Sequence, residues 1–188
     1  LESINTKIKE YKAENNLIEY LRENFGEIKS NSALMAESLV LLNVLSQIST
    51  KGKYSSICEW IDNFLESSNE KIIVAGISTE IIVELSKKYK CDKIIGSVNF
   101  KKRQEIVNDF QVNNKRILFM NMMTGGVGTD GLQYICQNVF IYELPWNWSS
   151  LDQLISRVER DGQIFKMSVY FMLSNTSIDE KKWDKVKY

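Results

Sequence analysis

The chain has 188 residues, of which 44% are hydrophobic and 26% are charged, as is ordinary for a soluble globular protein. Its 24 basic and 24 acidic side chains cancel, so any contact with nucleic acid has to come from a local patch. The chain contains no histidine, which excludes histidine zinc sites, histidine general bases and the Ser–His and Cys–His nucleophile pairs.

The sequence carries no signal for a membrane or an oxidising compartment. No apolar run reaches the roughly 18 residues needed to cross a bilayer, and residues 1–16 are polar and charged. Cys58, Cys91 and Cys136 are scattered, without the spacing of metal ligands. We therefore expect no metal site, no membrane partner and a cytoplasmic location. The Ile- and Asn-rich composition indicates a bacterial or viral source.

The first 68 residues predict a helical extension. Residues 7–24 place apolar side chains on about one face of a helix, and residues 32–49 are mostly apolar, with no Gly or Pro. Residues 54–67 carry a helical stripe of Ile, Trp, Phe and Leu. The Lys51-Gly52-Lys53 stretch separates the last two of these helices.

From residue 69 onward, short apolar runs alternate with helical segments, which predicts a parallel sheet covered on both faces. With right-handed crossovers, residues 69–188 form a doubly wound α/β fold of about five to six strands. Ligands of such sheets gather at the carboxyl ends of the strands. The predicted strands are 72–76, 93–97, 116–120, 138–142 and 167–173, and the predicted helices are about 79–90, 101–111, 129–136, 150–160 and 177–187.

A glycine-rich loop follows the third predicted strand, at residues 120–133. It holds four glycines between Gly125 and Gly131, which is costly inside regular structure but favourable where backbone closely approaches a ligand. Such a turn before a helix points backbone amides at an anion, with Thr124 adding a hydroxyl and Asp130 an acceptor. The loop is neither a Walker A motif nor a dinucleotide fingerprint. A tight turn without a ligand is the alternative interpretation.

A second motif lies on the helix predicted for residues 150–160. Ser150 and Gln153 have the spacing of a capping box, which predicts that the helix begins there. Gly162 is predicted to end the helix.

Gln153, Arg157 and Arg160 are spaced to lie on one face of that helix, which we expect near the carboxyl edge of the sheet. Two guanidinium groups there can hold phosphate oxygens bidentately. A solvated face, with Glu159 and Asp161 as ion-pair partners, is the alternative.

Together, these motifs resemble the second lobe of superfamily-2 helicases. That pattern has Thr or Ser, glycines and Gly-x-Asp or Gly-x-Asn, then a strand, then Gln-x-x-x-Arg-x-x-Arg. The Swi/Snf-type branch adds Trp-Asn, Gly-Gln and an upstream Gly, Arg and Phe. The matching residues are Thr124, Gly125, Gly126, Gly128, Asp130, Gln153, Arg157 and Arg160, and for the branch Trp146-Asn147, Gly162-Gln163, Gly96-Ser97, Arg103 and Phe110.

Three positions depart from the pattern of the Swi/Snf branch. Asp130 stands where Asn is usual, Gly131 where Leu is usual, and Trp148 where Pro is usual. These departures bear on the subfamily rather than on the class of motor.

The resemblance implies a RecA-like lobe that completes an ATP site together with a first lobe. Motors of this family hydrolyse ATP with Mg²⁺ between two lobes, and the first lobe supplies the Walker A lysine and the acidic pair. Neither pattern is present in this chain. We therefore expect the chain alone to be inactive as an ATPase, and its partner to be the first RecA-like lobe of the same parent chain.

The resemblance also implies roles for individual residues. Arg160 is expected to be the arginine finger on the γ-phosphate, Arg157 to share or brace that role, and Gln153 to orient them. Gly128 and Asp130 are expected to face the ribose of the nucleotide.

On the nucleic-acid side of the cleft, Ser97, Thr124 and the amides of Gly125 and Gly126 are expected to hold phosphates. Double-stranded DNA is the expected partner, contacted through its backbone without sequence readout. The basic run at residues 101–103 can add positive charge there, or its two lysines can belong to a solvated first turn of a helix.

Two other classes of function remain as alternatives. One is a RecA-like protein-interaction module without nucleotide chemistry, which would have no use for the Gln–Arg–Arg face. The other is a Rossmann-type enzyme for a dinucleotide or a methyl donor. That enzyme needs a glycine-rich loop after the first strand, where Ile77-Ser78-Thr79 stands instead.

Overall fold

The computed structural model describes residues 42–125, 129–175 and 177–187. The chain divides into two compact units, Leu1–Leu45 and Ser46–Tyr188, and the sheet lies in the second. α4 (Tyr54–Ser67) belongs to the same unit as the sheet, although the sequence assigned it to the helical extension. The predicted helices before residue 42 lie outside the described residues.

The second unit is built on a five-stranded, all-parallel sheet in the order β2-β3-β1-β4-β5. The central strands are short, mostly apolar and buried along their whole length, as expected for a sheet covered on both faces. The strands are β1 (Ile72–Gly76), β2 (Lys93–Ile94), β3 (Ile117–Asn121), β4 (Asn138–Ile141) and β5 (Ser168–Phe171). This confirms the predicted α/β class.

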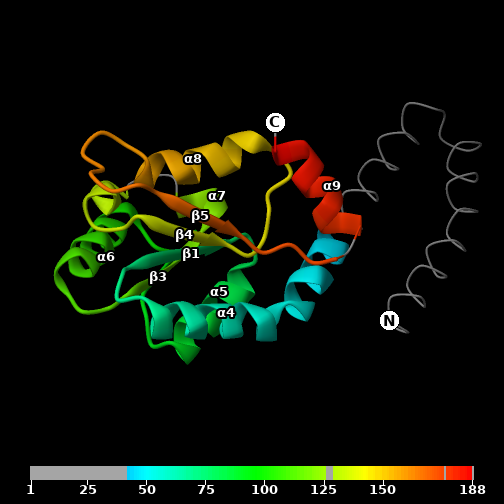
Figure 1. The fold of residues 1–188 in the computed structure, drawn as a ribbon, viewed down its shortest axis with the longest axis horizontal. Helices are drawn as coiled ribbons and strands as arrows, with labels where there is room; N and C mark the ends of the chain where they lie inside the picture. The colour runs from blue at the N-terminus through cyan, green and yellow to red at the C-terminus, as the bar shows by residue number, and fades with distance from the viewer. Residues whose placement is uncertain (1–41, 126–128, 176, 188) are drawn as a thin grey trace, which may run out of the picture. The chain divides into compact units, whose positions relative to one another are not determined.

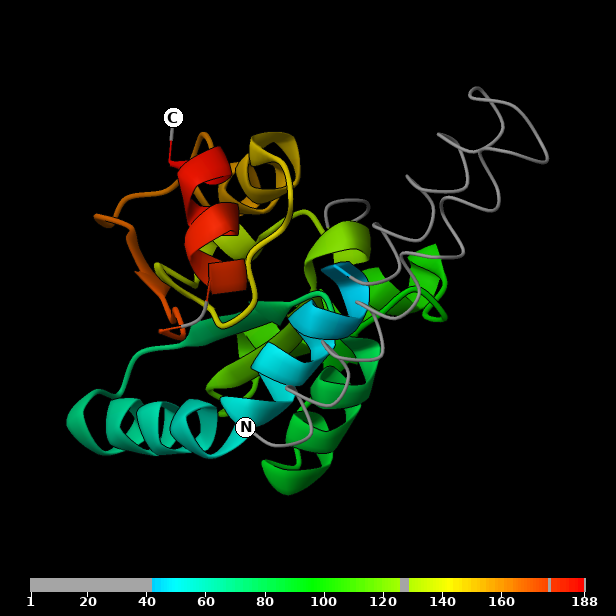
Figure 2. The ribbon, with the colours of Figure 1, turned by 90° about the vertical axis from the view of Figure 1, so that its right-hand side faces the viewer.

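The sheet separates two hydrophobic cores, because successive side chains of a strand point to opposite faces. Ile72 and Val74 of β1 pack with α4 and α5 (Thr79–Lys88). Ile73 and Ala75 pack in the core that α6 (Phe100–Val112), α8 (Trp148–Val158) and α9 (Ser177–Val186) cover. In Figure 2 the green α5 lies on one side of the sheet, and the orange α8 and red α9 lie on the other.

Two predicted elements differ from the structure. β2 is limited to Lys93–Ile94 rather than 93–97, because it is an edge strand and the chain turns at Gly96. The helix predicted for 129–136 is a single 3-10 turn, Leu132–Tyr134, preceded by Gly131 at a φ of +105°.

α8 also begins earlier than predicted. Its N-cap is Asn147, whose side-chain oxygen accepts from the amide of Ser150 at 2.8 Å, so Ser150 is not the cap. The helix ends at Val158, and Gly162 lies in the turn beyond, at a φ of +97°. Arg160 therefore follows the helix rather than lying on it.

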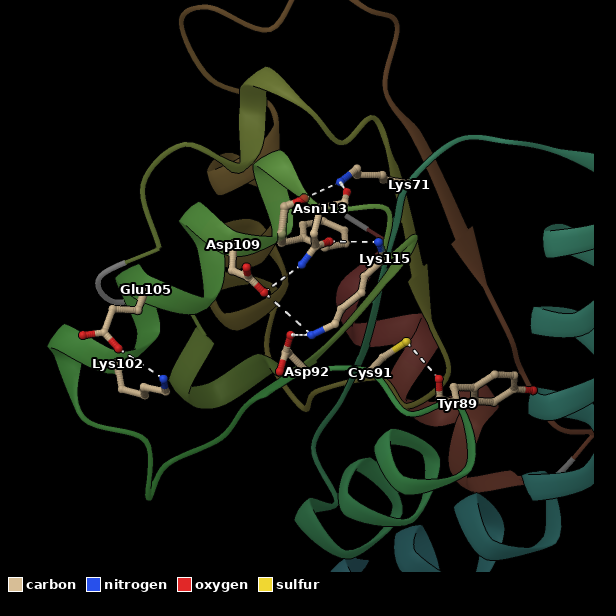
Figure 3. A network of polar contacts seen from close by, with 10 residues as sticks. Lys71, Tyr89, Cys91, Asp92, Lys102, Glu105, Asp109, Asn113 and Lys115 are labelled. Atoms are coloured by element: carbon tan, nitrogen blue, oxygen red, sulfur yellow. Dashed lines mark hydrogen bonds and ion pairs between the residues drawn. The ribbon is translucent and has the colours of Figure 1, made fainter.

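α6 is fastened to its neighbours by two lysines, as Figure 3 shows. The Lys71 ammonium donates to the carbonyl oxygens of Phe110 and Asn113 at the end of the helix. The Lys115 ammonium lies 2.7 Å from the Asp92 carboxylate and 3.7 Å from that of Asp109. The C-terminal end of α6 is thereby held against the loops that precede β1 and β3.

Candidate functional site

One carboxylate joins the two motifs that the sequence singled out. Oδ1 of Asp130 lies 2.6 Å from the Arg160 guanidinium and 3.7 Å from that of Arg157. The side chains of Asp130, Arg160 and Arg157 are 66%, 49% and 30% exposed. Ion pairs as exposed as these contribute only about 0–1 kcal/mol to stability. The two guanidinium groups are therefore gathered at one accessible place and are not buried in structural pairs.

This Asp130–Arg157–Arg160 cluster does not lie at the carboxyl edge of the sheet, where the sequence placed it. α8 starts near the carboxyl end of β4 and runs back over the sheet, as Figure 1 shows. Just beyond Arg160, the side-chain amide of Gln163 donates to the carbonyl oxygen of Cys136 at 2.9 Å, two residues before β4 begins. The cluster is therefore displaced toward the amino ends of the strands, because a helix between parallel strands runs opposite to them.

Two further residues, Gln153 and Gly128, were predicted for the nucleotide side. Gln153 is exposed on α8, one turn before Arg157. Gly128 lies outside the described residues.

The residues predicted for nucleic acid lie at the carboxyl edge itself. Ser97 is exposed in the turn after β2, and Thr124 and Gly125 lie in the short α7 (Met122–Gly125), directly after β3. A Cβ placed on Gly96 would lie 3.5 Å from Cγ2 of Thr124, so the two turns are in contact range. The structure thus brings Ser97 and Thr124 to one edge, while Gly126 lies outside the described residues.

Arg103 is part of this edge, but not as a solvated cation. Its guanidinium donates to the carbonyl oxygens of Val98, at 2.8 Å, and Thr124, at 2.9 Å, which ties the two turns together. Lys101 and Lys102 are both exposed, and Lys102 pairs with Glu105 at 3.1 Å. Within the basic run at 101–103, Arg103 therefore stabilises the conformation of the edge rather than adding positive charge to its surface.

The sequence interpretation missed a buried carboxylate at the same edge. Glu143 follows β4, and its Oε2 accepts from the amides of Ile77, at 3.0 Å, and Ser78, at 2.7 Å. Asn121, at the end of β3, donates to the carbonyl oxygen of Ile77 at 2.7 Å. The loops after three strands are thus joined by side chains. The acidic residue directly after a continuous apolar strand is the sequence pattern that could have identified Glu143.

A second missed feature is the buried ion pair of Lys53 and Asp179, at 2.7 Å. The Lys53 ammonium also donates to the carbonyl oxygen of Tyr142 at 2.8 Å, and Asp179 accepts from both the amide and the hydroxyl of Ser174 at 2.8 Å. Burial by itself would raise the pKa of Asp179, but the hydrogen bonds from Lys53 and Ser174 outweigh it and lower that pKa. The pair joins the start of α4 to α9.

Lys182 is a further buried cation, in α9. Its ammonium lies 5.2 Å from the centre of the Trp146 ring, and burial lowers the pKa of Lys182 despite the nearby carboxylates of Glu143 and Asp179. Trp146 is half-buried and packs against this lysine.

Over the residues that the structure describes, no group of Cys, Asp or Glu side chains is placed to hold a metal ion. Within the same ranges, no helix is both long and apolar enough to cross a membrane.

Comparison with known proteins places the chain in a family of helicase domains. Residues 52–162, more than half of the chain, match the family model of the helicase conserved C-terminal domain. The DNA repair and recombination protein RAD54-like of Drosophila willistoni is 26% identical over 136 residues, which cover 69% of this chain and 17% of that protein. The RAD54-like protein of Drosophila yakuba has the same identity and coverage.

The fold has a relative among solved structures. The C-terminal part of the Fun30 ATPase domain superposes with a TM-score of 0.63 at 19% identity, over 70% of this chain and 44% of that one. The likeness confirms the RecA-like fold that the motifs implied. The chain spans only about a sixth of the length of its RAD54-like relatives. It belongs to the helicase C-terminal domain family and is related there to ATPases of the Snf2 (Swi/Snf) type.

Proposed function

We propose that this chain is the second motor lobe of an ATP-dependent translocase on double-stranded DNA, with Arg160 as the arginine finger and Arg157 beside it. The observation that carries the proposal is the meeting of both guanidinium groups at Asp130, on an accessible surface. The first RecA-like lobe of the same parent chain is the proposed partner. It would hold the Walker A lysine and supply most of the ligands of the Mg²⁺ ion that accompanies ATP.

The energies favour an arginine finger that Asp130 positions but that can leave Asp130 easily. An exposed ion pair with Asp130 is worth about 0–1 kcal/mol. An arginine finger contributes about 10³–10⁵ in rate, which corresponds to roughly 4–7 kcal/mol at the transition state. A γ-phosphate that arrives with the first lobe can therefore draw Arg160 away from Asp130 at little cost. Gln153, one turn before Arg157, is proposed to orient the guanidinium groups or the phosphate.

The carboxyl edge is the proposed DNA side of the lobe. Ser97 and Thr124 present hydroxyl groups there, and the amides of Gly125 and Gly126 are proposed to join them on the phosphates of one strand. Asp130 and Gly128 would face the ribose of ATP. The loop after β3 supplies a residue to each side, Thr124 to the proposed DNA edge and Asp130 to the arginine cluster.

The test uses the chain joined to its first lobe, with ATP turnover measured with and without duplex DNA. Arg160→Ala and Arg157→Ala are each expected to lower the DNA-stimulated kcat by about 10³-fold or more while DNA affinity stays within about twofold. Lys166→Ala removes an exposed cation from the same loop and serves as the matched control.

Full turnover in both arginine variants would overturn the finger assignment. If the unsubstituted two-lobe protein shows no DNA-stimulated turnover, the alternative of a protein-interaction module without nucleotide chemistry takes its place.

DNA binding supplies an independent test of the partner. Binding through phosphates should show little preference for sequence, and its affinity should fall linearly with salt on logarithmic axes. Affinities measured on two unrelated duplexes at several salt concentrations would check this. A sequence-specific, salt-insensitive affinity would contradict the proposed DNA edge.

A further inference from the structure

Three glutamine side chains hold the backbone on which the Asp130 carboxylate sits. The Gln104 amide nitrogen donates to the carbonyl oxygen of Asp130 at 3.0 Å, and that of Gln111 donates to the carbonyl oxygen of Gly131 at 3.0 Å. The side-chain oxygen of Gln133 accepts from the amide of Gly131 at 3.0 Å. Two consecutive residues thus have three of their backbone polar groups bound by side chains from other positions.

The fit around Gly131 is close. Its φ is +105°, and a Cβ placed there would lie 2.3 Å from the Gln111 amide nitrogen. The turn is therefore shaped by glycine so that the backbone can rest directly on the Gln111 side chain. The hydrogen bond from Gln111 is partly buried, whereas that from Gln104 is exposed.

Gln104 and Gln111 both come from α6, which is held at each end. Near its start, Arg103 donates to the carbonyl oxygen of Thr124 at the proposed DNA edge. At its end, Lys71 binds the carbonyl oxygens of Phe110 and Asn113 (Figure 3). One helix thus contacts both Thr124 and the backbone of Asp130.

We infer that Gln104 and Gln111 are positioning residues of the motor, which set the Asp130 carboxylate, and through it Arg160 and Arg157, relative to the DNA edge. This inference rests on the proposed function. Asp130 orients the arginines, and the glutamines orient Asp130 through its backbone. α6 then serves as a rigid spacer, because Arg103 on the same helix is bound to Thr124. Neither glutamine is among the residues proposed to contact the nucleotide.

The experiment uses the two-lobe protein saturated with ATP and duplex DNA. Gln104→Leu keeps most of the side-chain volume but removes the donor, and it should lower kcat about fivefold, the scale of one lost hydrogen bond. Gln104→Glu sets an acceptor against the Asp130 carbonyl oxygen and should cost more. Gln104→Lys restores a donor and should recover turnover to within about twofold. Gln111→Leu should act like Gln104→Leu, with DNA affinity unchanged in each.

Gln137→Leu is the matched control, since it makes the same substitution at a glutamine that donates to Glu70, two residues before β1 begins. It should leave kcat unchanged, and the thermal unfolding midpoint of each variant should stay close to that of the unsubstituted protein. Equal losses in Gln104→Leu and Gln104→Lys would overturn the inference, because the donor would then be irrelevant.

The inference and the proposed function fail in different ways. Unchanged turnover in Gln104→Leu and Gln111→Leu, with Arg160→Ala inactive, overturns the positioning role and leaves the motor assignment standing. Unchanged turnover in the arginine variants overturns the finger assignment and the positioning role with it.

Discussion

At the scale of single residues, the site depends on one carboxylate and one glycine. Asp130 stands 30 residues before Arg160 in the chain, yet its oxygen is 2.6 Å from that guanidinium. Gly131 has a backbone conformation that L side chains rarely adopt, and it makes the turn that presents Asp130. The effect of removing the charge of Asp130 can therefore be measured separately from the effect of adding a side chain at Gly131.

Asp130→Asn removes the negative charge and keeps an oxygen acceptor in place. Because the ion pairs are largely exposed, we expect the free energy of unfolding to change by less than about 1 kcal/mol. Urea titrations at low and at high salt measure this, and the small difference should vanish at high salt. A loss of several kcal/mol that persists at high salt would show that the pair is structural.

Gly131→Ala tests the turn. The left-handed conformation and the close contact with Gln111 should lower the free energy of unfolding by about 1–3 kcal/mol. Gly52→Ala is the matched control. Gly52 lies in a helical stretch where a Cβ meets nothing within 4 Å, so this substitution should raise stability by up to about 1 kcal/mol. Equal effects from the two substitutions would contradict the strained turn.

At the scale of elements, α8 decides where the arginines lie. Its N-terminal end is set by the Asn147 cap, and its buried residues Leu151, Leu154 and Val158 pack on the core. These contacts determine the rotation of the helix, and hence the direction in which Arg157 projects.

Asn147→Ala should cost about 1 kcal/mol of stability, because it removes the acceptor for the Ser150 amide. Ser150→Ala should be nearly neutral, since the Ser150 side chain is not the cap. Thermal unfolding of both variants shows whether Asn147 or Ser150 caps α8. A larger loss from Ser150→Ala would restore the capping box that the sequence suggested.

At the scale of the whole Ser46–Tyr188 unit, the buried Lys53–Asp179 pair joins residues 126 positions apart. Its hydrogen bonds lower the pKa of Asp179 below the usual value of 3.8. A carboxyl group with a lowered folded pKa contributes stability that is complete above the unfolded pKa and disappears as the pH falls through the folded pKa. We expect the unit to lose stability below about pH 4, as measured by urea unfolding across the acid range.

Lys53→Met leaves the Asp179 charge buried without its partner, which should cost about 3–5 kcal/mol at neutral pH. Burial then dominates and raises the pKa of Asp179, so the deficit should shrink as the pH falls and the carboxyl group takes up a proton. The double variant Lys53→Met with Asp179→Asn should recover part of the loss at pH 7. A deficit independent of pH would contradict this account.

Local patterns in the sequence predicted most of the sheet. The run at 117–120 is apolar, too short for a typical helix and flanked by helical segments, so its length and its neighbours identify it as a buried strand. The limits of β2 and the 3-10 turn at 132–134 were not predictable in this way. An edge position and a left-handed glycine, rather than composition, ended those elements.

The sequence by itself determined the class of fold, the family motifs and the spacing that lets Arg157 and Arg160 reach one partner. All of these depend on periodicity and on neighbours within a few residues of each other. Only the tertiary structure decided that Asp130 is that partner, and that Gln104 and Gln111 bind the backbone of Asp130 and Gly131. It also decided that Lys53 pairs with Asp179. These contacts join segments from 20 to 126 positions apart, and they form only when the sheet brings its loops and helices together.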